Sequence, residues 1–591
     1  MCGIIAYTGR KNAAPLLKEG LKNLEYRGYD SAGYAVLSGK NFALVRRKGR
    51  VERLDEVPSP EGNTGIGHTR WATHGAPSER NAHPHVFGKF ALVHNGIIEN
   101  AHALKGELLA RGERFSSETD SEVIVHLIAR EYKGDFLRAV AAATKRLAGS
   151  YALAVLCSDF PDTVIGARGG SPLVAGRGKD GLYLASDVPA LARECAEVYS
   201  LREGEFVLLQ GDSIRFFDAD LREREGERAQ YDPEGEIPDK KGFPHFMKKE
   251  MAEIPAVLQK SVVNFEENLR FSALFKVLRQ AEYIHIAACG TAYHSALCAK
   301  YAIERLARVP VEACVASEYR YRDPVTPKGT LMLAVSQSGE TADTLAAAAL
   351  AKKKGACVAA VTNVPYSSLT HLADFILPTQ AGREIAVAAT KSFNAQLCTL
   401  YSLAVALARA KGKDATLGGL YALPPLAARA LSEAEKVRDW TPHFISAKSV
   451  FFIGRGADYC AALEGSLKLK EISYLPSEGY PAGELKHGTL ALVDYSTPVV
   501  AVLTQRPLAE KTMNAVHEAY ARGAKIFLVT AFPEYVAREE IFDSVFVPPC
   551  EELFSPVLSV IPLQSLAYFV AVARGNDPDK PRNLAKSVTV E

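Results

Sequence analysis

Paired cysteine motifs are missing from this sequence of 591 residues. Its ten cysteines are scattered along the chain, without the CxxC pairs of zinc sites or the cysteine density of small secreted domains. A net charge is nearly missing as well, because 70 Lys and Arg balance 68 Asp and Glu. The composition predicts reduced thiols and no metal site, and it argues against a nucleic-acid partner.

The amino terminus lacks the basic and apolar regions of a secretory signal, so we expect a cytoplasmic protein. The most apolar stretch, VLSVIPLQSLAYFVAVA from Val557, contains Pro562 and Gln564 and is shorter than a typical membrane span. It predicts a buried core helix, and no membrane partner is expected.

Residues 2–235 alternate short apolar runs with Gly, Asp and Asn, which predicts an α+β domain with layered sheets. Two helical stretches are expected in this domain, one after Asp120 and one over residues 189–198. A charged segment with Gly and Pro follows, where strand periodicity disappears. We place a linker there, at residues 236–248.

Strands, glycine turns and helices alternate after the linker, as is typical of doubly wound parallel α/β sheets. YIHIAACGTAYHSALCAK at Tyr283 is similar to SVFFIGRGADYCAALEGS at Ser449, and GACVAAVTN is similar to GAKIFLVTA. The repeat predicts two sister domains, at residues 249–425 and 426–591.

Cys2 could become a nucleophile with its own base. Removal of Met1 would free an α-amine whose usual pKa of about 7.7–8.0 is close to the thiol value of about 8.5. The amine could then accept the thiol proton, and Gly3 would leave room for a substrate. MCG alone is also compatible with a cysteine buried in an edge strand. The polar loops LEYRGYDSAG, GHTRWATHG, HNGIIEN and SSETDSEV favour the nucleophile.

With MCGI, these loops resemble the class II glutamine amidotransferases of the amino-terminal nucleophile type. The resemblance implies that Cys2 attacks the side-chain amide of L-glutamine, forms a γ-glutamyl thioester and releases ammonia. It implies an oxyanion hole and a glutamine site, in which a guanidinium holds the α-carboxylate and an acid holds the α-ammonium. The implied residues are Asn95 (side chain) and Gly96 (backbone N–H) for the hole, Arg70 and Asp120 for the two charges, and Trp71, Thr73 and His74 for the closing loop.

Five histidines lie in the same region, namely His68, His74, His83, His85 and His94. Their spacings do not fit the usual zinc patterns, and HPH has no acidic or cysteine partner nearby. We expect no metal here, and His74 is better explained by the substrate loop.

Two strand–glycine–helix turns predict an anion site in the first sister domain. In LMLAVSQSGETADTL, backbone N–H groups and hydroxyls meet at a helix start, where phosphate is the natural ligand. A plain helix N-cap also explains this motif. Together with ACGTAYHS it resembles the sugar isomerase (SIS) domains. The resemblance implies a sugar-phosphate site with Cys289, Gly290, Thr291, Ser336, Gln337, Ser338, Thr341, Val387 and Lys468.

In the second sister domain, Glu464, Lys468 and Glu471 share one helical face. Alone, this face predicts a salt-bridged surface in solvent. In order with SQSGET, ATKSF and DKPRNLAKSVTVE, it resembles the glutamine–fructose-6-phosphate aminotransferase (isomerising) family over essentially the whole chain. The resemblance implies Glu471 as the base between carbons 1 and 2, His487 as the group that helps open the sugar ring, and Lys586 as the imine-forming amine.

An imine-forming lysine must be neutral, and a pKa lowered by three units requires about 4 kcal/mol of desolvation or charge repulsion. We therefore expect the apolar tail around Lys586 to be buried. The resemblance also implies an internal ammonia channel with Trp71 as a gate, D-fructose 6-phosphate as the acceptor, and D-glucosamine 6-phosphate as the product. No metal or organic cofactor is needed. A homodimer is implied, with His487 serving the neighbouring subunit.

Two other functions fit parts of the sequence. A sugar-phosphate sensor would use the paired domains, but it would need neither Glu471 nor Lys586. Another glutamine amidotransferase, such as a phosphoribosyl transferase, would need a pyrophosphate loop with adjacent acids after a strand, and we find none in the sequence.

Overall fold

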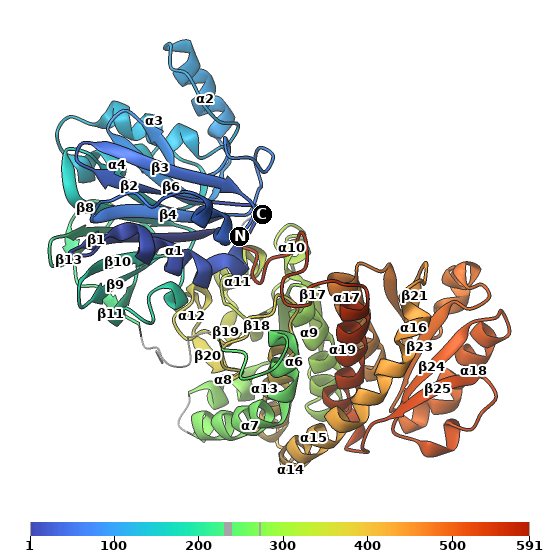
Figure 1. Ribbon diagram of the computed structural model, residues 1–591. Helices are drawn as coiled ribbons and strands as arrows, with labels where there is room; N and C mark the ends of the chain where they lie inside the picture. Colours follow the sequence, from blue (N-terminus) through green and yellow to red (C-terminus); the bar gives the residue numbers. More distant parts are fainter. Residues whose placement is uncertain (1, 230–238, 271–272, 590–591) are drawn as a thin grey trace. The chain divides into compact units, whose positions relative to one another are not determined.

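The computed structural model describes residues 2–229, 239–270 and 273–589. Met1 and residues 236–238 of the predicted linker lie outside this range. The chain divides into two compact units, Met1–Pro238 with Ala585–Glu591, and Asp239–Leu584. Figure 1 shows both units.

The first unit contains two antiparallel sheets (Figure 1). In order across the eight-stranded sheet, the strands are β15 (Glu227–Arg228), β11 (Cys195–Ser200), β9 (Val174–Gly178), β10 (Gly181–Ala185), β1 (Gly3–Gly9), β4 (Thr64–Arg70), β2 (Ser31–Ser38) and β3 (Asn41–Lys48). Those of the seven-stranded sheet are β14 (Glu223–Arg224), β13 (Ser213–Phe217), β12 (Phe206–Gln210), β8 (Phe160–Gly169), β7 (Gly149–Cys157), β6 (Phe90–Ile98) and β5 (His85–Phe87).

The two sheets pack face to face through an apolar core. Ile4 and Ala6 of β1 join Val93 of β6 in this core. Helix α1 (Ala13–Leu24) covers the other face of the first sheet, where a Cβ on Gly20 would come within 2.8 Å of Ile5. Helices α3 (Glu122–Glu131) and α4 (Phe136–Thr144) pack on the second sheet, and α2 (Ala101–Ala110) precedes them. The predicted layered α+β domain is confirmed.

The helix predicted after Asp120 is confirmed by α3, but the helix predicted over residues 189–198 is wrong. Only the short η3 (Val188–Ala190) is helical there, and β11 follows. Cys195 and Val198 are buried in the sheet, and the strand pairs with β9. Strand pairing with a distant segment therefore overrides the local helical pattern.

The second unit contains two parallel five-stranded sheets with the same strand order. The first sheet consists of β17 (Val311–Val315), β16 (Tyr283–Ala288), β18 (Thr330–Ser336), β19 (Cys357–Thr362) and β20 (Phe375–Pro378). The second consists of β22 (Ser477–Pro481), β21 (Val450–Gly454), β23 (Pro498–Leu503), β24 (Lys525–Thr530) and β25 (Ile541–Phe546). The predicted pair of sister α/β domains is confirmed.

Helices surround both sheets of this unit (Figure 1). The longer ones are α7 (Ile254–Arg270), α9 (Thr291–Leu306), α11 (Ala342–Lys353), α13 (Lys391–Ala410), α15 (Leu423–Ala434), α17 (Ala457–Ser473), α18 (Ala509–Tyr520) and α19 (Pro556–Ala573). Shorter ones are α6 (Phe246–Ala252), α8 (Leu274–Gln280), α10 (Ala316–Tyr319), α12 (Ser368–Leu372), α14 (Gly418–Tyr421) and α16 (Thr441–Phe444).

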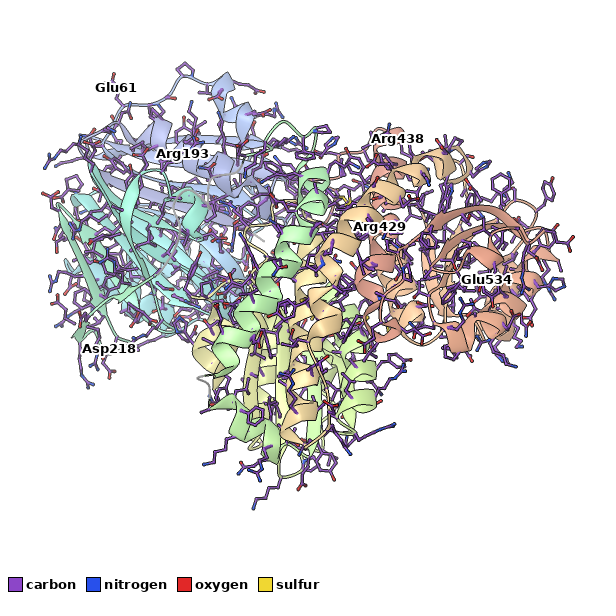
Figure 2. All side chains as sticks on the ribbon, turned by 90° about the horizontal axis from the view of Figure 1, so that it is seen from below. Glu61, Arg193, Asp218, Arg429, Arg438 and Glu534 are labelled. Carbon is purple, nitrogen blue, oxygen red and sulfur yellow. The ribbon has the colours of Figure 1, made fainter. Side chains whose placement is uncertain are left out.

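The apolar run from Val557 forms α19, and its residues are buried through Ala571. This helix is long and apolar enough to span a membrane, but 89% of its most apolar window is buried inside the protein. The predicted core helix is confirmed. Charged side chains such as Arg429 and Glu534 lie instead at the surface (Figure 2).

Candidate active sites

Cys2 lies directly before β1, beside the loop that follows β4. The backbone N–H of Trp71 donates to the Cys2 sulfur at 3.3 Å. The Cys2 carbonyl accepts hydrogen bonds from Asn95 Nδ2 at 3.0 Å and from Arg27 Nε at 3.1 Å. Burial raises the pKa of the Cys2 thiol, and the Trp71 N–H and Arg70 act in the opposite direction. A thiol in this position needs a nearby base to become a nucleophile.

The structure brings Asn95 and Gly96 beside Cys2. Asn95 is buried in β6, and Gly96 follows it with φ 136°. A Cβ on Gly96 would lie 2.0 Å from the Ser150 carbonyl oxygen, so the strand tolerates only glycine at this point. The amide of Asn95 therefore lies against Cys2, and Gly96 follows it in the same strand.

Arg70 ends β4 and is buried. Its Nη2 donates to the carbonyls of His74 at 2.5 Å and Gly75 at 2.9 Å. Its Nη1 is buried and has no hydrogen-bond partner in the described residues. Because a guanidinium holds a carboxylate through paired N–H groups, this free nitrogen is suited to an anionic ligand group.

Asp120 accepts a hydrogen bond from the Ile98 N–H at 2.8 Å. The loop of Trp71, Thr73 and His74 is anchored where Asp30 accepts the Ala72 N–H at 2.9 Å. Thr73 and His74 are exposed, whereas Trp71 is half-buried. The structure thus places the polar groups of the expected glutamine site around Cys2 and leaves part of the loop in solvent.

The other four histidines form a buried cluster. His68 stacks on His83 with ring centroids 4.1 Å apart, and His83 contacts His85 at 4.5 Å. Burial lowers the pKa of all four imidazoles, that of His85 to about 3. The described residues contain no group of side chains that could hold a metal ion.

In the second unit, the face of Glu464, Lys468 and Glu471 is a largely buried network. The Lys468 ammonium is 1% exposed and lies 2.5 Å from Glu471 and 3.5 Å from Glu464. It also donates to Thr291 Oγ1 at 3.0 Å. Burial alone would lower the pKa of Lys468, but the carboxylates of Glu471 and Glu464 raise it overall. The two carboxylates therefore keep Lys468 protonated although it is buried.

Two residues at these sites are not marked by the sequence motifs. His294 lies one turn after Thr291 on α9, and its Nδ1 is 2.7 Å from Glu464 Oε2. The i, i+3 spacing in TAYHS was the available signal. Arg27, which binds the Cys2 carbonyl, pairs with Asp187 at 2.9 Å, and no local motif marks it.

The SQSGET loop connects β18 to α11. Ser336 Oγ lies 2.9 Å from Thr341 Oγ1 and accepts the Gly339 N–H at 3.1 Å. Ser338 Oγ accepts the Glu340 N–H at 3.2 Å. The Gln337 carbonyl accepts the Asn363 N–H at 3.1 Å, which anchors the loop on the end of β19. Its hydroxyls thus gather at the start of a twelve-residue helix, where anions are favoured.

Cys289 and Gly290 form the turn between β16 and α9. Gly290 has φ 54°, and Cys289 Sγ is 3.8 Å from Thr344 Oγ1 of α11. This contact places the turn next to the SQSGET helix. Val387 is held elsewhere in the unit, where its N–H donates to the Asp579 carbonyl at 3.0 Å.

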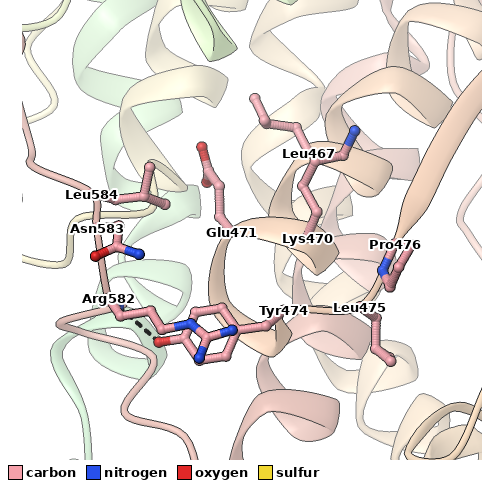
Figure 3. Close-up of a pocket in the computed structure, with 9 residues that line it drawn as sticks. All are labelled: Leu467, Lys470, Glu471, Tyr474, Leu475, Pro476, Arg582, Asn583 and Leu584. Atoms are coloured by element: carbon pink, nitrogen blue, oxygen red, sulfur yellow. Dashed lines mark hydrogen bonds between the residues drawn. The ribbon is translucent and has the colours of Figure 1, made fainter.

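A pocket of about 500 Å³ opens beside Glu471. Figure 3 shows that Tyr474 and the tail residues Arg582, Asn583 and Leu584 line it. The Arg582 N–H donates to Tyr474 Oη at 2.7 Å. The tail motif PRNL therefore lies next to the predicted base.

His487 and Lys586 are the remaining predicted residues. His487 is exposed on η5 (Leu485–His487). Lys586 lies in the short tail that belongs to the first unit, and it is half-buried. The full burial expected around Lys586 is therefore not found, because the tail forms only turns and bends there and Val588 is 54% exposed.

The corresponding loop of the second sister domain is arranged differently. Asp458 on α17 is 2% exposed and accepts the backbone N–H groups of Thr504 at 2.8 Å and Gln505 at 3.2 Å. The Thr504 hydroxyl also donates to it. An internal carboxylate thus occupies the N–H donors of this loop.

Comparisons with known proteins agree with this division. The glutamine amidotransferase domain family matches residues 68–193, and the SIS domain family matches residues 277–406 and 443–574. A solved structure of the C-terminal domain of glucosamine-fructose-6-phosphate aminotransferase from Francisella tularensis is 37% identical, with a TM-score of 0.55, and covers 58% of this chain and 100% of its own. Glucosamine-6-phosphate deaminase from Thermotoga maritima is 26% identical, with a TM-score of 0.50, over 58% of this chain and 100% of its own.

Relatives that align over the full length of the chain have a higher sequence identity to it than these two structures. Glutamine–fructose-6-phosphate aminotransferases (isomerizing) of Clostridium tetani, Symbiobacterium thermophilum and Thermus thermophilus are 45%, 47% and 44% identical. Each alignment covers 100% of this chain and 100% of the relative. The chain therefore belongs to the glutamine–fructose-6-phosphate aminotransferase (isomerizing) family.

Proposed function

We propose that the chain hydrolyses L-glutamine and transfers the ammonia to D-fructose 6-phosphate, which it isomerises to D-glucosamine 6-phosphate. The observation that carries the proposal is the presence in one chain of two different reactive sites. One is a cysteine surrounded by N–H donors, and the other is a buried ammonium between two carboxylates.

In the first reaction, the Cys2 amine takes the thiol proton after Met1 is removed. The thiolate attacks the amide carbon of glutamine, and the oxyanion is stabilised by Asn95 Nδ2 and the Gly96 N–H. The Cys2 ammonium gives its proton to the amide nitrogen as the C–N bond breaks, ammonia leaves, and water hydrolyses the thioester to glutamate. Arg70 Nη1 has no hydrogen-bond partner among the residues that the structure describes, which supports a role in binding the α-carboxylate, and Asp120 takes the α-ammonium.

In the second reaction, the Lys586 amine condenses with carbon 2 of the opened ketose and releases water. Ammonia then replaces Lys586 at carbon 2, and Glu471 moves a proton from carbon 1 to carbon 2. The carbon-1 hydroxyl proton passes to the nitrogen, which leaves an aldehyde at carbon 1 and an amine at carbon 2. The hydroxyls of the SQSGET loop bind the phosphate, and Lys468 holds the sugar beside Glu471. Ammonia reaches this site through an internal channel with Trp71 as its gate.

The protein acts in the cytoplasm as a homodimer, and His487 from one subunit helps open the sugar ring in the other. The exposure of His487 on η5 supports a role toward a neighbouring chain. No nucleic acid or membrane takes part.

The decisive assay supplies glutamine and fructose 6-phosphate together and detects an amino sugar phosphate by mass spectrometry. The expected result is one amino sugar phosphate for each glutamate. Glutamate without any amino sugar would remove the synthase proposal and keep the amidotransferase one. Ammonium chloride replacing glutamine serves as the control for the second reaction.

A further inference from the structure

We infer that His68 is a positioning residue of the glutamine site, which fixes the side-chain amide of Asn95 with its NH2 group toward Cys2. The inference rests on the proposed hydrolysis of glutamine and adds a residue to it. The two residues lie on different sheets, His68 on β4 and Asn95 on β6. Because β4 pairs with β1, their contact links the two sheets directly beside the nucleophile.

The distances around His68 determine the direction of its hydrogen bonds. Its Nε2 lies 2.9 Å from the His94 carbonyl oxygen and 3.1 Å from Asn95 Oδ1. A backbone carbonyl can only accept, so Nε2 must carry a proton. The atom of the Asn95 amide that faces this N–H must then be the oxygen.

The other end of the amide follows from this assignment. With Oδ1 held by His68, Nδ2 of Asn95 points to the Cys2 carbonyl at 3.0 Å. The reversed amide would present an oxygen to the negative charge that develops beside Cys2. Because a donor is needed there only when the oxyanion forms, a reversed Asn95 amide would lower kcat more than it would weaken glutamine binding.

The surroundings of His68 keep it in this state. The ring is fully buried, its Nδ1 has no hydrogen-bond partner in the described residues, and His83 stacks on it. Burial holds the pKa of His68 well below its usual range. A neutral ring has a single N–H, and the His94 carbonyl selects Nε2 for it.

The test compares His68→Leu, His68→Gln and Asn95→Ala in the full chain. His68→Leu removes the donor and should lower kcat for glutamine hydrolysis by about 100-fold, with KM changed by less than about threefold. His68→Gln keeps an N–H donor and should recover most of the loss. In the Asn95→Ala background, His68→Leu should cause no further loss, because both changes remove the same interaction.

Alkylation of Cys2 by iodoacetamide is the internal control. This reaction forms no oxyanion, so its rate should stay within about twofold of wild type in each variant. Fully additive losses in the double variant, or equal losses for Leu and Gln, would overturn the inference. If His68→Leu does not fold, His68→Met provides the same comparison. A wild-type chain that does not hydrolyse glutamine would refute the proposed function instead.

Discussion

Gly290 and Gly456 share one backbone conformation, with φ 54° and ψ −128° in the first and φ 57° and ψ −128° in the second. Gly290 lies between β16 and α9, and Gly456 lies between β21 and α17. A left-handed φ favours glycine at both positions. The side chains that come next differ, since Thr291 follows Gly290 and Ala457 follows Gly456. The duplicated turn therefore keeps its shape while only one copy carries the hydroxyl that meets Glu464 and Lys468.

Gly96→Ala should abolish glutamine hydrolysis. The added Cβ would lie 2.0 Å from the Ser150 carbonyl oxygen, and φ 136° is strained for alanine, so the oxyanion donors would shift. Gly106→Ala is the matched control, because nothing lies within 4 Å of its Cβ in the middle of α2. The control should keep full activity and gain about 0.5–1 kcal/mol of stability. Glutamate release and thermal denaturation measure both effects, and an active Gly96→Ala enzyme would contradict this geometry.

Arg70→Lys should raise KM for glutamine by about 10- to 100-fold and leave kcat less affected. A lysine keeps the positive charge but cannot hold a carboxylate through two N–H groups. Steady-state kinetics would show the split, and Arg46→Lys on β3, two strands away in the same sheet, serves as a control for the loss of a guanidinium. An unchanged KM would show that the free Arg70 nitrogen does not bind the substrate.

Lys468→Met should destabilise the second unit by about 3–5 kcal/mol, because Glu464 would keep a buried charge without its cation. Adding Glu464→Gln should restore part of the stability, while amino sugar synthesis stays absent. Urea denaturation of the two single variants and the double variant gives the coupling energy. Additive changes in the free energy of unfolding would mean that Lys468 and Glu464 do not interact. Retained glutamine hydrolysis serves as the control for an intact first unit.

The first unit should lose stability as the pH falls from about 6.5 toward 3. The four buried histidines have folded-state pKa values below their usual 6.5, that of His85 at about 3. The unfolded chain therefore binds protons that the folded unit does not, and stability is complete only above pH 6.5.

This pH dependence can be measured with one tryptophan. The chain has two, Trp71 and Trp440, so a Trp440→Phe variant reports on the first unit alone during urea denaturation. His83→Phe should reduce the slope by about one proton, which is about 1.4 kcal/mol per pH unit. A denaturation midpoint that stays constant from pH 7.5 to 4.5 would rule out the neutral buried cluster.

His487→Ala and Glu471→Gln subunits should each be inactive in amino sugar synthesis. If one subunit supplies His487 to the Glu471 of the other, a mixed dimer regains one intact site. Refolded 1:1 mixtures should then show about a quarter of wild-type activity, since half the dimers are mixed and one of their two sites works. No recovery in the mixture would place both residues in one subunit's site.

The sequence predicted the candidate sites best where polar side chains directly follow a strand. The polar SQSGET loop stands directly after an apolar run, so its place at a strand end follows from local pattern, whereas HNG, also expected to be a loop, lies inside β6. Burial of the Glu464 face could not be predicted locally, because α9, which contacts Glu464 and Lys468, comes from a distant segment. The same limit hid the His68 contact, which depends on how two sheets stack, and Arg27, whose partner Asp187 is distant in the sequence. The helix predicted over residues 189–198 was wrong for the opposite reason, because strand pairing with β9 outweighed the local helical pattern.

Asp458 makes the loop of the second sister domain unfavourable for an anion. The fold contains two loops of the same kind, but in the second the backbone donors already face a carboxylate of the protein itself. A phosphate at this loop would be repelled by the negative charge of Asp458, and the N–H groups of Thr504 and Gln505 are already hydrogen-bonded. The two copies of the loop have therefore diverged, because serine hydroxyls accept the backbone N–H groups of the first and Asp458 accepts those of the second.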